Sequence, residues 1–338
     1  MLAFQRIAPY GQDSPNVSSA RGERMIYHTD EWLRFVAASQ DATPVRAVLE
    51  ENGRVLGETC GLVVSKLGMK ILGSPLPGWT TMYMGFVLEP GVPRWEALEA
   101  LRTFAFGVLG CVHLEVVDRH LSARGAPRPR MIREYVESWE TDLTRSEDEL
   151  FGAMDGACRR CIRKAEKSGV TIEEAEDDAF ADDYYAQLIE VFRKQGLVPT
   201  YGVDRVRALL SSLRRSEQVL LLRARDPEGK CIATGIYPGM NRVAQFWGNA
   251  SFRASQNLRP NEALNWFAQR TWKSRGAEVF DWGGGGTYKA KYGCTPLRVP
   301  RFCDSKYPLL AHLRSAAQLA FQGRQRLLGA LHVPRGSA

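Results

Sequence analysis

Long apolar runs are absent from this sequence. Its most hydrophobic stretches, such as Val219–Leu222, are far too short to cross a bilayer. The opening residues MLAFQRIAPYGQDSP contain no apolar core before a cleavage site, so a secretory signal is not expected. The seven cysteines, scattered over 338 residues, suit a reducing compartment better than a disulfide scaffold. We therefore expect a cytoplasmic protein without a transmembrane segment.

Metal-binding patterns and nucleotide-binding motifs are also missing. The five histidines follow no ligand spacing, and Cys158-x-x-Cys161 has no second Cys or His pair at the distance that a zinc site needs. The glycine run Gly283–Gly286 is followed neither by Lys-Ser/Thr nor by a helix pattern, which argues against a phosphate loop and a dinucleotide fingerprint. We expect no metal and no permanently bound cofactor.

The glycine run has a different use. It stands in the stretch DWGGGGTYKAKYG, with apolar strand patterns close on both sides, so a flexible linker is disfavoured. We interpret it as a bend that lets the backbone approach a bound substrate, with Lys289 presented beside it. If the segment continues as extended chain, Lys291 points to the opposite face. A tight turn with a solvated lysine is the alternative.

The composition is that of an ordinary globular protein with a basic bias. Hydrophobic residues make up 44% of the chain and charged residues 25%, and the length leaves room for two domains. The net charge of +7 favours an anionic partner such as nucleic acid, a nucleotide cofactor or a membrane surface. Many cytoplasmic proteins of this charge bind no polyanion, so the charge alone does not decide.

Periodicity predicts alternating helices and strands. A helix capped by Thr29 precedes a hairpin whose turn is Asn52-Gly53. Later, a Ser-x-x-Glu capping box opens one long helix over Ser146–Gly169, and one strand is expected over 242–252.

The second half of the chain repeats the first. Each half has a helix, a hairpin, a long helix closed by Gly110 or Gly276, and then a strand that ends Glu-Val-x-Asp. These strands are Glu115–Asp118 and Glu278–Asp281. The repeat predicts one domain fold used twice, although helix–Gly–strand order is common in mixed folds.

Three stretches resemble the FemAB-like, or BioF2-type, branch of the GNAT acyltransferase superfamily. They are the strand and Arg-rich helix of Ser138–Ile172, the Pro-Asn–helix–Gly–strand–Asp–Gly segment of Leu258–Gly284, and YKAKYG at Tyr288–Gly293. The resemblance implies an α+β (α/β) fold of tandem GNAT-like domains, each a mixed, mostly antiparallel sheet flanked by helices. The implied domains are 1–135 and 136–305, with a C-terminal helix at 306–332 that folds back on the first.

The resemblance also implies the chemistry. In GNAT-type transfer an amine attacks the donor carbonyl directly, so the protein orients the reactants, removes a proton and stabilises the oxyanion. The family lysine matches Lys289, which we expect to supply that stabilisation. Asp281 is the candidate that accepts a proton or orients the amine, with a loop-capping carboxylate as the alternative.

The donor is either aminoacyl-tRNA or acyl-CoA. Enzymes that use acetyl-CoA place a glycine-rich turn before the central helix, whereas this chain reads Gln256-Asn-Leu-Arg-Pro-Asn261. The missing glycines and the proline, which lacks an amide proton, favour the FemAB-like branch, whose characterised members use aminoacyl-tRNA. A basic helix face is then the candidate contact with tRNA, although such faces are more often only solvated. Its members are Arg159, Arg160, Arg163 and Lys164.

The acceptor is expected to be a small-molecule or glycan-precursor amine, bound by a monomer. The stretch after a Pro-Gly turn, with exposed aromatic rings, is a candidate lining of the acceptor pocket. The candidate substrate-binding residues are Trp79, Thr80, Tyr83, Arg259, Asn261, Gly284 and Tyr288. Two other functions stay open: an acetyl-CoA-dependent N-acetyltransferase acting on an amino sugar or a polysaccharide or cell-envelope precursor, and a catalytically inactive binding module.

Overall fold

The computed structural model describes residues 1–11, 22–124, 126, 131–307 and the single positions 310, 314 and 323. The chain forms two compact units. The first is built mainly of Met1–Ser138, Gly283–Gly285 and a segment that begins at Pro296; the second is built mainly of Trp139–Trp282 and Gly286–Thr295. The domain limits expected from the sequence remain a proposal, and the helix expected over 306–332 lies almost wholly outside the described residues.

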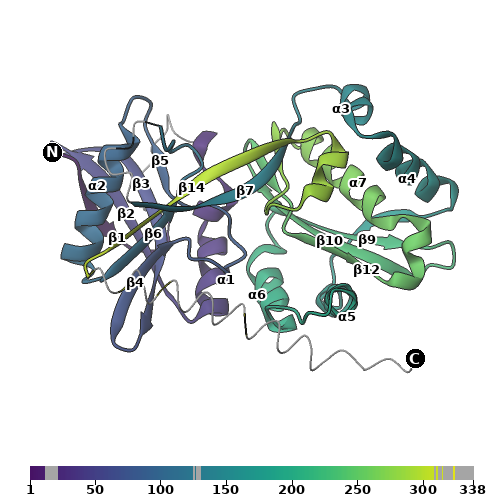
Figure 1. Cartoon of the computed structure of the whole chain (residues 1–338), viewed down its shortest axis with the longest axis horizontal. Helices are drawn as coiled ribbons and strands as arrows, with labels where there is room; N and C mark the ends of the chain where they lie inside the picture. Colours follow the sequence, from purple (N-terminus) through teal and green to yellow (C-terminus); the bar gives the residue numbers. More distant parts are fainter. Residues whose placement is uncertain are drawn as a thin grey trace. The chain divides into compact units, whose positions relative to one another are not determined.

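The first unit is a mixed sheet with helices on both faces (Figure 1). Its strands are β1 (Ala3–Ile7), β2 (Thr43–Glu51), β3 (Arg54–Lys66), β4 (Met69–Ser74), β5 (Phe86–Leu88), β6 (His113–Val117) and β14 (Thr295–Ser305). The order is β1-β2-β3-β4-β6-β14, with β5 paired to β3. The helical segments are η2 (Ile26–His28), α1 (Asp30–Gln40), α2 (Arg94–Thr103) and the π-helical η3 (Phe104–Val108).

Local signals explain these elements. The Thr29 side chain accepts the amide hydrogen of Trp32 and caps α1 as predicted, and the apolar face of this helix is buried. Asn52 and Gly53 have φ angles of 52° and 79°, which suit the tight turn between β2 and β3. The α2 helix packs its apolar face on the sheet, in a core that includes Phe4, Phe86 and Phe302.

The second unit is also a mixed sheet between helices. Its strands are the Trp139–Asp142 end of β7 (Ile132–Asp142), β8 (Thr171–Glu174), β9 (Val219–Arg225), β10 (Cys231–Met240), β11 (Val243–Gln245), β12 (Gly248–Ser251) and β13 (Val279–Asp281). The order is β7-β13-β11-β10-β9-β8, with β12 paired to β10. The helical segments are α3 (Glu147–Ala153), α4 (Gly156–Lys167), α5 (Phe180–Lys194), α6 (Val203–Leu213), η5 (Arg253–Leu258), α7 (Pro260–Ser274) and η6 (Thr287–Tyr292). Figure 1 shows α7 on one face of this sheet and α5 and α6 on the other.

The two units use the same arrangement around the strand that ends Glu-Val-x-Asp. In the first unit, β6 lies between β4, which is parallel to it, and β14, which is antiparallel. In the second, β13 lies between the parallel β11 and the antiparallel β7. Each follows a long helix, α2 or α7. The predicted α+β fold of tandem, mostly antiparallel mixed sheets is confirmed.

Two predicted elements are each divided. The helix expected over Ser146–Gly169 is two helices, because Met154 adopts an extended conformation and the Asp155 side chain caps α4 by accepting the amide hydrogen of Cys158 at 2.5 Å. The strand expected over 242–252 is divided into β11 and β12 at Phe246, whose amide donates to the carbonyl of Asp281 at 2.7 Å. None of the helices in the described ranges combines the length and hydrophobicity that a bilayer-crossing segment requires.

Candidate active site

A cavity of about 560 Å³ opens in the second unit, at the start of α7. This volume is in the range of small-ligand sites. The walls come from the end of α5, from β12, from η5, from the first turns of α7 and from η6. The lining residues are Glu190, Val191, Lys194, Gln195, Asn249, Ser251, Arg253, Gln256, Asn261, Glu262, Asn265, Tyr288, Lys291 and Tyr292.

The sheet leaves room for this cavity because β11 and β12 diverge at Phe246. β11 pairs with β13, whereas β12 turns away and, within the described part of the chain, pairs only with β10. Asn249 and Ser251 of β12 line the cavity. The α7 helix begins beside them, with Arg259 as a left-handed cap (φ 59°) and Pro260 in its first turn.

A buried hydrogen-bond chain fixes the inner wall. The Tyr237 hydroxyl donates to Asn265 Oδ1, and Asn265 Nδ2 donates to the Tyr292 hydroxyl, both at 2.8 Å. The Tyr292 ring stacks on Trp282 with 4.3 Å between ring centroids. Burial raises the pKa of Tyr237 and of Tyr292 well above the usual value, so both hydroxyls stay protonated and able to donate.

Lys289 and Lys291 have different surroundings. The Lys291 ammonium lines the cavity and lies 2.7 Å from Glu262 Oε1. Lys289 is only 5% exposed, its ammonium donates to the Trp282 carbonyl at 2.7 Å, and it does not line the cavity. Burial lowers the pKa of Lys289 to about 8, although the nearby Asp281 carboxylate acts to raise it.

The conformation of this segment differs from the expectation. The glycine run is a bend, with φ of 54° at Gly283 and 62° at Gly284, and this part of the interpretation is confirmed. The residues after it form the 3₁₀ helix η6 and not an extended chain. In a 3₁₀ helix side chains repeat every three residues, so Lys289 shares the buried face with Tyr292, and Lys291 faces the cavity with Tyr288.

Two buried polar residues end the parallel strands. Gln245 is the last residue of β11 and Asp281 the last of β13, and the two are paired in register. Gln245 is 1% exposed and Asp281 is fully buried. Among the described residues, neither side-chain atom of the Gln245 amide has a hydrogen-bond partner. A buried amide without hydrogen-bond partners lowers the stability of the folded state.

The cavity contains two of the predicted substrate-binding residues, Asn261 and Tyr288. Arg259 and Gly284 are exposed and do not line it. Trp79 and Tyr83, expected to be exposed, are 4% and 0% exposed in the first unit, where Tyr83 packs edge-on against Tyr27. That expectation of exposure was wrong, because the apolar area of these rings is used in the core.

Thr80 adopts a left-handed backbone conformation (φ 53°), and its hydroxyl donates to the Trp79 carbonyl at 2.6 Å. A role of these first-unit residues in acceptor binding remains a proposal.

The basic helix α4 begins next to the cavity wall. The amide of Asp155, its capping residue, donates to the Lys291 carbonyl at 2.9 Å. Arg160, Arg163 and Lys164 are exposed. Arg159 is half-buried, and its guanidinium donates to the Gly152 carbonyl at 2.6 Å. Three of the four predicted cations are thus accessible to a polyanion.

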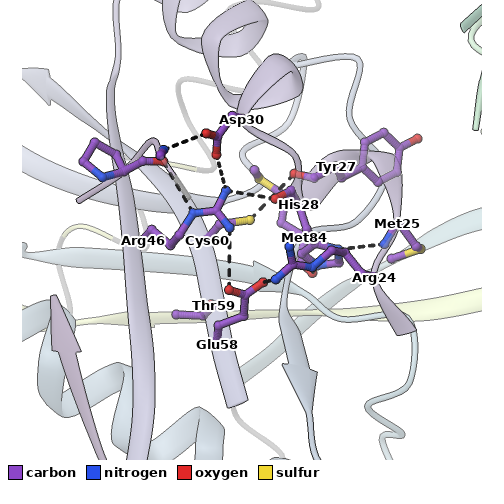
Figure 2. A network of polar contacts seen from close by, with 12 residues as sticks. Arg24, Met25, Tyr27, His28, Asp30, Arg46, Glu58, Thr59, Cys60 and Met84 are labelled. Carbon is purple, nitrogen blue, oxygen red and sulfur yellow. Dashed lines mark hydrogen bonds and ion pairs between the residues drawn. The ribbon is translucent and has the colours of Figure 1, made fainter. Parts of the chain in front are cut away.

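The first unit holds a buried network of charges that the sequence did not indicate (Figure 2). The Arg46 guanidinium lies 2.9 Å from Asp30 and 3.6 Å from Glu58, and Arg24 lies 2.5 Å from the same glutamate. His28 Nδ1 accepts the Met25 amide hydrogen, so Nε2 donates to the Met84 carbonyl at 2.5 Å. Burial lowers the pKa of His28 to about 4, and the ring is neutral at physiological pH.

This network ties η2 and α1 to β2 and β3. Each charged side chain in the network lies beside a charge of opposite sign, as buried charges require to be stable. We therefore assign the network a structural role.

The residues that sequence reasoning missed are Asn265, Tyr292, Glu262 and Gln245. Asn261 and Asn265 are one helical turn apart on α7, and this spacing was the available signal. Tyr292 lies 27 positions from Asn265 in the chain. Only the fold brings the two together.

Comparison with known proteins supports this reading of the second unit. The family model of the acetyltransferase (GNAT) domain matches residues 155–292. No curated protein sequence matches the chain.

Several solved structures share the fold over most of the chain. FemX superposes with a TM-score of 0.69 at 13% identity, over 88% of this chain and 96% of FemX. A tandem GNAT protein from the clavulanic acid biosynthesis pathway superposes with a TM-score of 0.54 at 12% sequence identity. The superposition covers 91% of this chain and 99% of that protein. L-PGS from Bacillus licheniformis superposes with a TM-score of 0.53 at 12% sequence identity. The superposition covers 87% of this chain and 93% of L-PGS. At these identities the likeness establishes the fold alone.

Proposed function

We propose, from the match of residues 155–292 to the acetyltransferase (GNAT) domain model, that this chain transfers an acyl or aminoacyl group from an activated donor to an amine acceptor by direct attack. The observation that carries the proposal is the cavity at the start of α7, which is large enough for the acyl end of a donor and is lined by hydrogen-bonding groups. The resemblance of Ser138–Ile172 and Leu258–Gly284 to the FemAB-like branch supports the aminoacyl version over the acetyl version.

The start of α7 disfavours a pyrophosphate. Pro260 lacks an amide proton, and Glu262 places a carboxylate in the first turn, where the helix would otherwise attract an anion. Both features act against coenzyme A at the place where its pyrophosphate would lie. An ester of tRNA would place its phosphates elsewhere, and the exposed cations of α4 begin beside the cavity. We therefore propose aminoacyl-tRNA as the donor.

Lys289 is the proposed electrostatic catalyst. Its ammonium is held at the end of β13 by the Trp282 carbonyl and the Asp281 charge. A charge in a water-poor position stabilises a developing oxyanion more strongly than a solvated one. Asp281 and Gln245, at the carboxyl ends of parallel strands, are proposed to orient the acceptor amine, since ligands of α/β sheets bind at that edge.

A transfer assay tests the proposal. The purified chain is incubated with a pool of radiolabelled aminoacyl-tRNA or with labelled acetyl-CoA, together with a panel of amino sugars and other primary amines. Labelled amide from aminoacyl-tRNA supports the proposal. Product only from acetyl-CoA would favour an N-acetyltransferase instead, and ligand binding without any product would indicate an inactive binding module.

A further inference from the structure

The charged residues of the cavity form two groups. Glu190, Lys194 and Arg253 belong to the first group, in which Glu190 accepts the Arg253 amide hydrogen at 2.6 Å. Glu262 and Lys291 form the second, joined at 2.7 Å. Lys194 and Arg253 are exposed, so the first group presents exposed cationic ends that suit a phosphate. The second group presents a carboxylate in a recess.

The second group is built to hold an ammonium. Glu262 is 13% exposed, and the Lys291 ammonium beside it shows that a group of this size and charge fits against the carboxylate. Lys291 lines the cavity and its side chain is 29% exposed, so its flexible stem allows the ammonium to move into solvent when another ammonium takes its place. A carboxylate with two oxygens also accepts more than one N–H donor.

Asn261 supplies a second acceptor next to Glu262. Its Nδ2 donates to Ser251 Oγ at 3.0 Å, which fixes the orientation of the amide. Its Oδ1 is buried and, in the described part of the chain, has no hydrogen-bond partner. An unpaired buried oxygen is unfavourable unless a ligand pairs with it. Asn261 and Glu262, which are adjacent in α7, thus both line the cavity and both carry an acceptor oxygen.

We propose that Glu262 and Asn261 form a subsite for the α-ammonium of the acyl group that is transferred. The inference rests on the proposed function and names the class of donor: an aminoacyl ester, selected over simple acyl groups because only the former brings an ammonium. The exposed cations Lys194 and Arg253 then receive a phosphate of the same donor.

Binding of hydrolysis-resistant donor analogues tests this subsite. The probes are a 3′-aminoacylamido-adenosine 5′-phosphate and its counterparts with the α-amino group replaced by hydroxyl or hydrogen, titrated calorimetrically into the full chain. We expect the amino probe to bind roughly 10- to 100-fold more tightly, as for a hydrogen bond to a charged group. In Glu262→Gln this preference disappears while binding of the desamino probe is unchanged. Glu190→Gln, on the other wall, is the matched control and keeps the preference.

Three outcomes would overturn the inference: no preference for the amino probe, a preference that survives Glu262→Gln, or an equal loss in both variants. The transfer assay is read separately. Amide formation without discrimination among the probes would leave the proposed function standing and remove the subsite. If the chain discriminates among the probes but transfers no acyl group, the subsite stands and the proposed function is wrong.

Discussion

The ammonium of Lys289 lies 2.7 Å from the carbonyl oxygen of Trp282, the residue that directly follows β13. This contact anchors the lysine to the end of the strand that also carries Asp281. The charge is therefore held by the fold in a buried position, and it does not depend on the surface chemistry of the cavity.

The pH dependence of turnover reports on this lysine. Burial lowers its pKa to about 8, so its charged form, present below that pH, is lost as the pH rises through 8. We expect kcat at saturating donor to fall above about pH 8 for this reason. Lys289→Arg keeps a positive charge and should remove this alkaline limb, whereas Lys291→Arg should retain it. If the fall of kcat at alkaline pH is the same in both variants, a group other than Lys289 titrates there.

The network around Arg46 is expected to stabilise the first unit. Arg46→Met leaves the half-buried Asp30 and the buried Glu58 without their central cation, and should lower the free energy of unfolding by about 3–5 kcal/mol. Arg54→Met is the matched control, because Arg54 pairs with Glu89 but its side chain is 72% exposed. That change should cost about 0–1 kcal/mol. Urea denaturation of the two variants decides, and equal losses would contradict the assignment.

Coenzyme A should bind weakly, if at all, at the start of α7. Pro260 and the Glu262 carboxylate occupy the turn that would have to hold the pyrophosphate. Calorimetry with acetyl-CoA measures this directly. A dissociation constant in the low micromolar range, lost in Arg259→Ala, would show that the exposed arginine replaces the missing glycine turn. The acetyl-CoA alternative would then be preferred.

Much of the fold was readable from the sequence because it depends on local chemistry. The Thr29 cap, the Asn52-Gly53 turn and the burial of one face of α1 each involve residues within a few positions of one another. The break at Asp155 was missed because the same residue can continue a helix or cap a new one, and only packing decides. The cavity was not predictable, since it combines Asn249, Asn265 and Tyr292 from separate elements.

The basic helix α4 is expected to contact the phosphates of tRNA. The double change Arg160→Glu with Lys164→Glu should weaken binding of aminoacyl-tRNA and make the slope of log K against log salt less steep by about 2, one unit for each lost phosphate contact. Lys230→Glu, in an exposed turn of the same unit, serves as the control for net charge. If all three charge reversals act alike, the helix contributes only to the overall field of the protein.

The most direct test of the account is turnover of Lys289→Met and Lys291→Met at saturating donor, in the assay that detects the labelled amide. If the buried ammonium at Trp282 stabilises the oxyanion, Lys289→Met lowers kcat by roughly 10²–10³-fold. Lys291→Met, which removes the cavity partner of Glu262 and leaves that carboxylate open to the donor ammonium, should change kcat much less and lower KM for the donor. Equal losses in the two variants, or an unchanged kcat in Lys289→Met, would contradict the assignment of Lys289 as the electrostatic catalyst.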